Sequence, residues 1–470
     1  MNKEDLLWQP ARLFPVTGIG GIDEQERRGC SAFLAVVQSV REFGRALTSR
    51  CGAPLGAIST FIEVPFDLDG KTLRPDGLIR VVRGQRSWTA LVEVKTGKND
   101  LNAEQISSYL DIAREQGFDA VITISHEVAT TPGVHPVVVD KRKLKKVALF
   151  HLSWSRILTE ARIEQASNAI SDPDQSWILS EFVRYLENPK SGAWDFDDMG
   201  PCWTQVRDQA ILQTLRPTAS ETLEVVSKFD QLIAYSAMRL SRELGVNVQQ
   251  YLSKKDRADH VIRLQTQAAS LVKAGQLKGS LVVPNAASTL DINMDLRANR
   301  IDCSTTLQAP SEGRASTRIN WLIRQLKDAP DSLLIKAVGS RAVFGPSQPL
   351  SAVRSDPTCL LFPGMPEIKS FSLLLTKPAG SKSGKGRSSF VASVTDLVDE
   401  FYAGVMQYLK VWTPPPPKPI QKIEGDAQEV VVLGTLLPEL KTAQDAEEST
   451  EDESLAADHA ILQASDDYFS

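Results

Sequence analysis

Residues 74–97 read RPDGLIRVVRGQRSWTALVEVKTG, in which two apolar, β-branched runs flank the dipeptide Gly84-Gln85. Glycine supplies the positive φ that a two-residue hairpin turn requires, so the runs are predicted to be antiparallel strands. In that register Asp76 faces Glu93 across the pair. Charged groups are rarely found inside a sheet without a partner. Any fold for this chain must therefore account for two carboxylates at one end of an apolar hairpin.

Facing side chains in such a pair have Cβ atoms about 4.5–5.5 Å apart. Two carboxylates repel at that separation by roughly 4 kcal/mol at an effective dielectric constant near 20. A cation between them offsets this repulsion. Lys95 lies two residues beyond Glu93, on the same face of the strand, and is one candidate. A divalent ion such as Mg²⁺, which prefers oxygen ligands, is the other.

A second turn is predicted at Asp69-Gly70, and its register places Glu63 opposite Asp76. This extension is weaker than the first hairpin, because Pro65 and Pro75 have no N–H to donate to a ladder. If it forms, it adds a third acid to the same end of the sheet.

Carboxylates, a divalent ion and an ammonium group are components of phosphodiester hydrolysis. The ion polarises the phosphoryl oxygen and lowers the pKa of bound water. Lys95 would orient that water or take its proton, since partial burial near a metal can lower the pKa of a lysine.

These residues also resemble a family. Pro75-Asp76, followed by Glu93-Val94-Lys95, is similar to the signature of the PD-(D/E)XK nuclease superfamily. Gln105 and Tyr109, in EQISSY, resemble the QxxxY motif of its RecB-like branch, and their spacing puts them on one face of a helix. The resemblance covers about residues 20–160.

The resemblance implies a role for each matching residue. Asp76 and Glu93 would ligate Mg²⁺, or Mn²⁺ as a substitute, with help from the Val94 carbonyl, and Glu63 is a further candidate ligand. Lys95 would position the attacking water. Gln105 and Tyr109 would steer Lys95 or touch the nucleic-acid backbone. The family often adds an acid from its first helix, for which Glu24 and Glu26 are candidates and Glu26 is preferred.

The order of elements agrees with an α/β fold: a restriction-endonuclease-like mixed sheet flanked by helices, in a domain of residues 1–165. Periodicity predicts helices at 22–47 and 102–116, and strands at 58–66, 76–82, 88–95, 120–125 and 147–152.

The remaining chain is predicted to form a helical region over 166–275 and an α+β module over 276–412. A Pro-rich linker and a disordered acidic tail are predicted over 413–470. Within the α+β module, a helix at 314–327 carries Arg314, Arg318 and Trp321 beside its apolar stripe. Those three form either a nucleic-acid face or a solvated surface.

Composition bears on the partners. Residues 424–470 contain thirteen acids and one lysine, so the rest of the chain is mildly basic, which permits a nucleic-acid partner. The five cysteines form no CxxC pair, as expected for reduced thiols in a cytoplasmic protein. No apolar run is long enough to cross a membrane.

The sequence therefore predicts a cytoplasmic, Mg²⁺-dependent nuclease with DNA favoured over RNA as substrate, in DNA repair, restriction or defence. The C-terminal modules would select the substrate or a protein partner. The alternative is an inactive nuclease-fold protein that binds nucleic acid or a protein as a regulator or scaffold.

Overall fold

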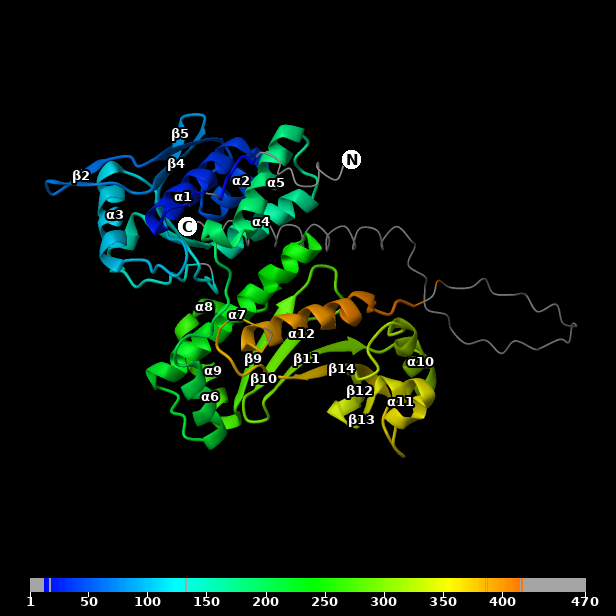
Figure 1. The fold of residues 1–470 in the computed structure, drawn as a ribbon. Helices are drawn as coiled ribbons and strands as arrows, with labels where there is room; N and C mark the ends of the chain where they lie inside the picture. Colours follow the sequence, from blue (N-terminus) through cyan, green and yellow to red (C-terminus); the bar gives the residue numbers. More distant parts are fainter. Residues whose placement is uncertain are drawn as a thin grey trace, which may run out of the picture. The chain divides into compact units, whose positions relative to one another are not determined.

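The computed structural model describes residues 12–16, 18–131, 133–384, 386, 388–414 and 416. Their secondary structure is organised around two large sheets, one in the N-terminal and one in the C-terminal half (Figure 1). The predicted acidic tail lies outside the described residues.

The first sheet has five strands in the order β1-β4-β5-β6-β7. Their bounds are β1 (Ala57–Ile62), β4 (Gly77–Arg83), β5 (Arg86–Val94), β6 (Ala120–Ser125) and β7 (Ala148–Ser153). Strands β1, β4 and β5 pair antiparallel, whereas β5, β6 and β7 pair parallel. Strand β5 therefore lies between an antiparallel and a parallel neighbour, and the prediction of a mixed sheet is confirmed.

The predicted hairpin register is confirmed. Ile79 faces Ala90 in the β4–β5 pair, and Gly84 in the turn has a φ of 60°. The second register also holds, although the turn at Asp69-Gly70 belongs to a separate small hairpin of β2 (Phe66–Leu68) and β3 (Lys71–Leu73). Strand β1 continues its pairing with β4 to the point where the Glu63 N–H donates to the Asp76 carbonyl at 3.2 Å.

Helices cover both faces of this sheet. Helices α1 (Ile22–Ser39), α2 (Arg41–Arg50), α4 (Trp154–Ala166) and α5 (Pro173–Glu187) share a core with one face, and α3 (Ala103–Gln116) packs on the other. The α3 helix begins at the predicted place because Asn102 accepts from the N–H groups of Glu104 and Gln105. It ends there because Gly117 adopts the left-handed conformation.

The prediction of one helix over 22–47 is wrong, because the chain bends between α1 and α2. Val40 leaves the helical region, with φ −102° and ψ 98°. Gly44 makes the bend possible: a Cβ at this position would lie 2.0 Å from the Val37 carbonyl oxygen. The apolar spacing continues across the bend, so the sequence periodicity does not reveal it.

The second sheet has seven antiparallel strands in the order β13-β12-β14-β11-β10-β9-β8. Its strands are β8 (Gln249–Gln250), β9 (Gln276–Val282), β10 (Leu290–Asp295), β11 (Arg300–Gln308), β12 (Leu334–Gly339), β13 (Phe344–Pro349) and β14 (Ile368–Pro378). The remaining helices are α6 (Trp203–Leu212), α7 (Ser220–Leu244), α8 (Lys254–Ala258), α9 (His260–Ala274), α10 (Ala315–Gln325), α11 (Leu350–Ser355) and α12 (Phe390–Gly404). Short 3-10 turns occur at Lys143–Lys145, Pro189–Ser191, Ser340–Ala342, Pro357–Leu360 and Met406–Tyr408.

Two main cores divide the predicted helical region of 166–275 between them. Helix α5 packs with the first sheet, whereas α6, α7 and α9 share the core of the second sheet. Helices α7 and α12 contact each other on the second sheet, where Figure 1 shows them crossing its strands. The helices of this region therefore complete the two sheet cores.

Arg318, on α10, departs from both alternatives offered by the sequence. Its side chain is 4% exposed, and its guanidinium donates to the Ile368 carbonyl at 2.6 Å and pairs with Glu367 at 2.5 Å. The prediction that it belongs to a surface face is wrong. The whole side chain is buried, and its guanidinium ties α10 to the start of β14.

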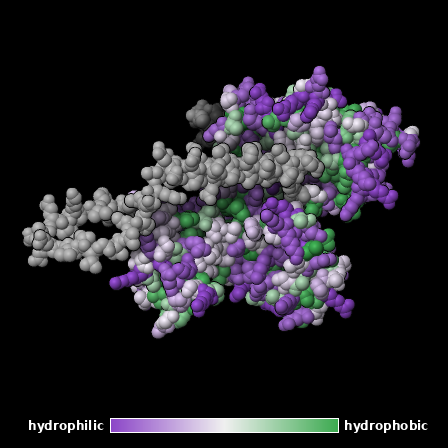
Figure 2. Space-filling model, turned by 180° about the vertical axis from the view of Figure 1, so that it is seen from behind, coloured by the Kyte–Doolittle hydropathy of each residue, from purple (hydrophilic) through white to green (hydrophobic). Residues whose placement is uncertain are grey.

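The exposed surface is mostly polar. Figure 2 shows hydrophilic side chains over much of the visible face of the described residues, with apolar residues in small groups between them. No helix in the described ranges is both long and apolar enough to cross a membrane. All five cysteines are free thiols, as predicted.

The half-buried His151 on β7 makes the stability of the fold depend on pH. The His151 Nε2 lies 2.9 Å from the Glu127 carbonyl and its Nδ1 lies 2.9 Å from the Thr123 hydroxyl, while the His135 ring packs against it. Burial lowers the pKa of His151 to about 3. The folded protein thus keeps this ring neutral at pH values where the unfolded chain protonates it.

We expect this residue to make the protein less stable as the pH falls below about 6.5, the ordinary pKa of histidine. Between pH 7 and pH 5 its share of the lost unfolding free energy is about 2 kcal/mol. Urea unfolding of wild type and His151→Gln at both pH values measures it, because the variant removes this share alone. An equal pH dependence in both proteins would show that His151 is not buried neutral.

Candidate active site

Asp76, Glu93 and Lys95 meet where β4 begins and β5 ends. The Asp76 carboxylate accepts a hydrogen bond from the Val94 N–H at 2.7 Å, which carries the β4–β5 contact past the last paired residues of the ladder. Lys95 follows β5 directly, and its N–H donates to the Ile124 carbonyl on β6 at 2.8 Å. The residue before β4 thus holds the main chain at Val94, and strand β6 holds it at Lys95.

Glu93 is a buried carboxylate that lacks ordinary hydrogen-bond donors. Its residue is 1% exposed, and neither carboxylate oxygen has a partner of normal hydrogen-bond geometry, although Lys95 Nζ lies 2.9 Å from Oε1. Burial and the nearby Asp76 raise the pKa of Glu93 to about 7. Burial likewise raises the pKa of Asp76. Both shifts arise first from burial, and the charge of Asp76 adds to the shift of Glu93.

Lys95 lies between two acids. Its Nζ is 2.9 Å from Glu93 and 3.3 Å from Glu26, and its side chain is 17% exposed. Burial alone would lower the pKa of Lys95, but Glu93, Glu26 and Asp76 together raise it above its ordinary value. The lowered pKa was expected for a lysine beside a bound metal ion and stays a prediction. In this arrangement the acids favour the ammonium form of Lys95, which can hold and orient a water.

Glu26 of α1 is the acid that joins the site from the first helix. Its Oε1 accepts from the Asn99 side chain at 2.7 Å and from the Thr96 N–H at 3.4 Å, while its Oε2 contacts Lys95. Glu24 instead pairs with Arg28 and accepts from the Gly20 N–H. The preference for Glu26 over Glu24 agrees with these contacts.

Gln105 and Tyr109 form a hydrogen-bonded pair on α3, with Gln105 Nε2 donating to the Tyr109 hydroxyl at 2.9 Å. The Tyr109 hydroxyl donates to the Arg74 carbonyl at 3.4 Å, just before Asp76. Burial and the charge of Glu93 raise the pKa of Tyr109. The structure thus places this pair near Glu93. Gln105 and Tyr109 share one face of α3, as their spacing predicts.

Glu63 contributes its main chain to this region. Its N–H contacts Asp76 as the predicted register requires, but the side chain is exposed and the residue has a φ of 48°. A positive φ takes the chain out of the regular strand conformation at this position. The Glu63 side chain therefore does not point in the direction that a paired strand residue would have.

Three residues of the site carry no sequence motif. Asn99 and Thr96 hold Glu26, as described above. Trp154, at the start of α4, donates its indole N–H to the Lys95 carbonyl at 2.9 Å and is 2% exposed. Trp154 lies far along the chain from Lys95, so no local spacing could have indicated this contact.

Asp76 and Glu93 provide some, but not all, of the ligands that a Mg²⁺ ion needs. Among the described residues there is no group of three or more His, Cys, Asp or Glu side chains arranged to hold a metal. The pair Asp76 and Glu93 nevertheless offers two adjacent carboxylates, and the buried Glu93 oxygens have no hydrogen-bond partner of normal geometry. Mg²⁺ commonly binds through one or two carboxylates and completes its octahedron with water and substrate phosphate. This pair suits such a site.

A scan against models of known protein families finds no match for the chain, and no curated protein sequence is significantly similar to it. The interpretation of the site therefore depends on its own geometry and chemistry.

Proposed function

We propose that this protein is a metal-dependent nuclease that hydrolyses phosphodiester bonds in nucleic acid, with DNA favoured over RNA. The observation that carries the proposal is the position of the Lys95 ammonium between Glu93 and Glu26, next to Asp76. Glu93 is 1% exposed, and the Lys95 ammonium is the main group that offsets its charge, which is unusual for a buried carboxylate with a purely structural role. Such groups cluster where a protein binds an ion or performs catalysis.

Asp76 and Glu93 would hold the Mg²⁺, with Mn²⁺ as a substitute and the Val94 carbonyl as a further ligand. When bound, the ion would polarise a phosphoryl oxygen and lower the pKa of a coordinated water. The hydrogen bond from the Val94 N–H fixes one Asp76 oxygen and leaves the other available.

Lys95 would orient the attacking water and stabilise negative charge that develops on the phosphoryl group. Glu26, itself held by Asn99, keeps the ammonium in place and charged. The Tyr109 hydroxyl, which accepts a hydrogen bond from Gln105, lowers the pKa of the Glu93 carboxylate and so favours its charged form. Each of these roles uses a group that the fold already holds in position before substrate binds.

The test compares wild type with Lys95→Ala on single-stranded DNA, duplex DNA and RNA, each with Mg²⁺ or with EDTA. We expect Mg²⁺-dependent cleavage by the wild type and its loss, by at least about 100-fold, in the variant. Lys327→Ala, which removes an exposed lysine in the second half, is the matched control and should cleave normally.

Binding without cleavage by both proteins would instead support the inactive, nucleic-acid-binding alternative. The small number of side-chain ligands around Asp76 and Glu93 is the observation that favours this alternative. Cleavage by Lys95→Ala at the wild-type rate would contradict the proposed site.

A further inference from the structure

A second site is indicated by a cavity of about 640 Å³, between α4, the segment after α5, and α7. Its walls include three aromatic and three arginine side chains: Trp154, Trp194, Tyr235, Arg162, Arg239 and Arg242. Ligand-binding cavities usually have volumes of about 300–1,000 Å³ and combine apolar surface with a few fixed polar groups. This cavity meets both conditions.

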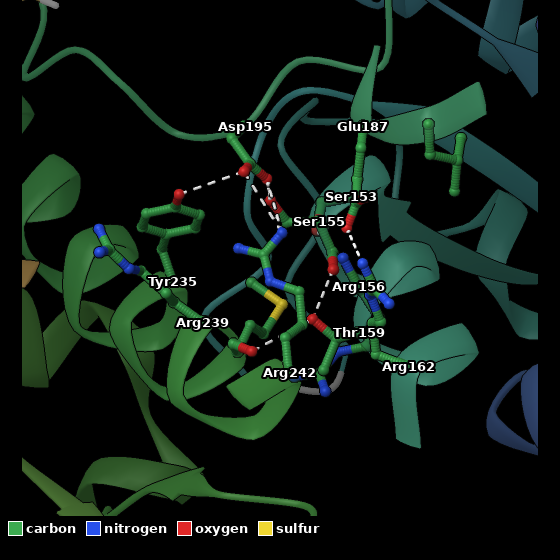
Figure 3. A network of polar contacts seen from close by, with 12 residues as sticks. Ser153, Ser155, Arg156, Thr159, Arg162, Glu187, Asp195, Tyr235, Arg239 and Arg242 are labelled. Atoms are coloured by element: carbon green, nitrogen blue, oxygen red, sulfur yellow. Dashed lines mark hydrogen bonds and ion pairs between the residues drawn. The ribbon is translucent and has the colours of Figure 1, made fainter. Parts of the chain in front are cut away.

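One wall of the cavity is held rigid by a polar network centred on Asp195 (Figure 3). Its carboxylate accepts from Arg242 at 3.2 Å, from the Tyr235 hydroxyl at 3.3 Å and from the Ser155 hydroxyl. The Arg242 guanidinium also lies over the Tyr235 ring, 5.6 Å from its centre. A wall fixed by this many contacts does not have to be ordered when a ligand binds, which reduces the entropic cost of binding.

The charges of the lining limit the charge of the ligand. The arginines are matched by three acids, Glu187, Asp195 and Glu243, so the lining is close to neutral. A polyanion such as a nucleic-acid strand is not attracted by such a surface. A ligand with one small anionic group fits better, provided that one arginine is free to exchange its partner.

Arg162 is the arginine best placed for that exchange. It pairs with Glu187 at 2.5 Å, and the two side chains are 39% and 44% exposed. An exposed pair of this kind contributes only about 0–1 kcal/mol. Arg242 is 13% exposed and bound within the network, and Arg239 pairs with Asp399 on α12 at 2.7 Å. A phosphate group can therefore replace Glu187 on Arg162 at little cost.

The aromatic side chains supply the rest of the recognition. Trp194 is half-buried on the wall, with Lys98 Nζ 5.8 Å from its ring centre, and an aromatic base stacked on such a ring gains about 1–3 kcal/mol. We propose that this cavity binds a nucleoside monophosphate, with its base against Trp194 and its phosphate on Arg162.

The choice of a nucleotide among planar aromatic ligands depends on the proposed nuclease function, whose smallest products are mononucleotides. Trp154 also connects the two places, because it lines the cavity and donates to the Lys95 carbonyl. A product bound in the cavity would thus lie one side chain away from the candidate active site.

The test is isothermal titration calorimetry of the full-length protein with AMP, adenosine and ribose 5-phosphate, each up to about 5 mM. We expect saturable binding of AMP, weaker binding of adenosine and no detectable binding of ribose 5-phosphate. Trp194→Ala should weaken AMP and adenosine by at least about tenfold. Arg162→Gln should weaken AMP by about tenfold and leave adenosine unchanged. Trp177→Ala, which removes a 54% exposed tryptophan on α5 outside the cavity, is the matched control.

Absence of saturable AMP binding would overturn the proposal, and so would unchanged affinity in both cavity variants. Arg162→Gln keeps the test decisive if Trp194→Ala does not fold, because its side chain lies at the surface. Cleavage is assayed on the same preparations. Cleavage without AMP binding contradicts only the cavity proposal, whereas AMP binding without cleavage contradicts only the nuclease.

Discussion

Glu93→Gln is expected to lose metal-dependent cleavage by at least about 1,000-fold while its unfolding free energy stays within about 1 kcal/mol of the wild type at pH 8. The amide keeps the shape of the side chain but cannot serve as an anionic ligand, and it removes one of the two acids that hold Lys95. Activity and stability therefore respond differently to the same change, which is expected where a group is retained for function.

The stability part of this result follows from the raised pKa of Glu93. Because its folded-state pKa, about 7, exceeds the ordinary value of 4.5, the folded protein favours the protonated carboxyl. Its stabilising contribution is complete below pH 4.5 and is lost as the pH rises through about 7. At pH 8 the charged group is therefore unfavourable in its buried position. The neutral amide avoids that cost, which offsets the weaker pairing of Lys95.

Cleavage assays and urea unfolding at pH 5 and pH 8 measure both effects. Glu104→Gln, which neutralises an exposed acid in the first turn of α3, is the control and should change neither. Near-normal cleavage by Glu93→Gln would remove this carboxylate from the mechanism. A loss of several kcal/mol at pH 8 would show that Glu93 is mainly a structural partner of Lys95.

Asp230→Ala is expected to have the largest effect on stability, a loss of about 3–5 kcal/mol. Asp230, on α7, pairs with Arg263 of α9, whose side chain is 5% exposed. Arg263 also donates to Thr130 and Thr131, at 3.1 Å each, in the segment that follows β6. The pair thus ties the second core to the N-terminal half. Without the carboxylate, a buried guanidinium is left with two hydroxyls and the Asp256 carbonyl as its neutral partners.

Urea unfolding of the variant measures this loss. Asp208→Ala, which breaks a pair with Arg207 whose acid is 54% exposed, is the matched control and should cost no more than about 1 kcal/mol. The double variant Asp230→Leu with Arg263→Met should recover part of the loss, because it removes both buried charges. Equal losses of unfolding free energy in Asp230→Ala and Asp208→Ala would show that the buried pair contributes no more to stability than the exposed one.

Local patterns predicted the parts of the molecule that local forces determine. The turn at Gly84-Gln85 sets the β4–β5 register, and that register alone brings Asp76 beside the end of β5. Helix α3 was predicted from its periodicity, and its ends are set by the Asn102 cap and the left-handed Gly117. In each case the residues that determine the structure are close together in the sequence. A local pattern is therefore enough to predict the hairpin and the helix.

Contacts between distant segments were not predictable in this way. The bend at Val40 depends on the close approach of Gly44 to the preceding turn, and periodicity does not record it. The pairing of Lys95 with Glu26 joins the end of β5 to helix α1, and no local spacing in the sequence indicates it. Arg318 was assigned to the surface because its deep carbonyl partner lies on a strand about fifty residues away. The bend, the ion pair and the buried arginine all depend on packing between segments that are distant in the sequence. A pattern of spacing along the chain carries no information about that packing.

The hairpin of β4 and β5 has an exposed turn at one end and the carboxylates of Asp76 and Glu93 at the other. Seven residues of strand β4 span about 23 Å, so the exposed Gly84-Gln85 turn lies far from the carboxylates at the other end. This turn is therefore a suitable place to insert an affinity tag or attach a fluorophore. Such a label would allow the protein to be immobilised without covering Asp76 and Glu93, so that the proposed binding of nucleic acid can be followed on single molecules.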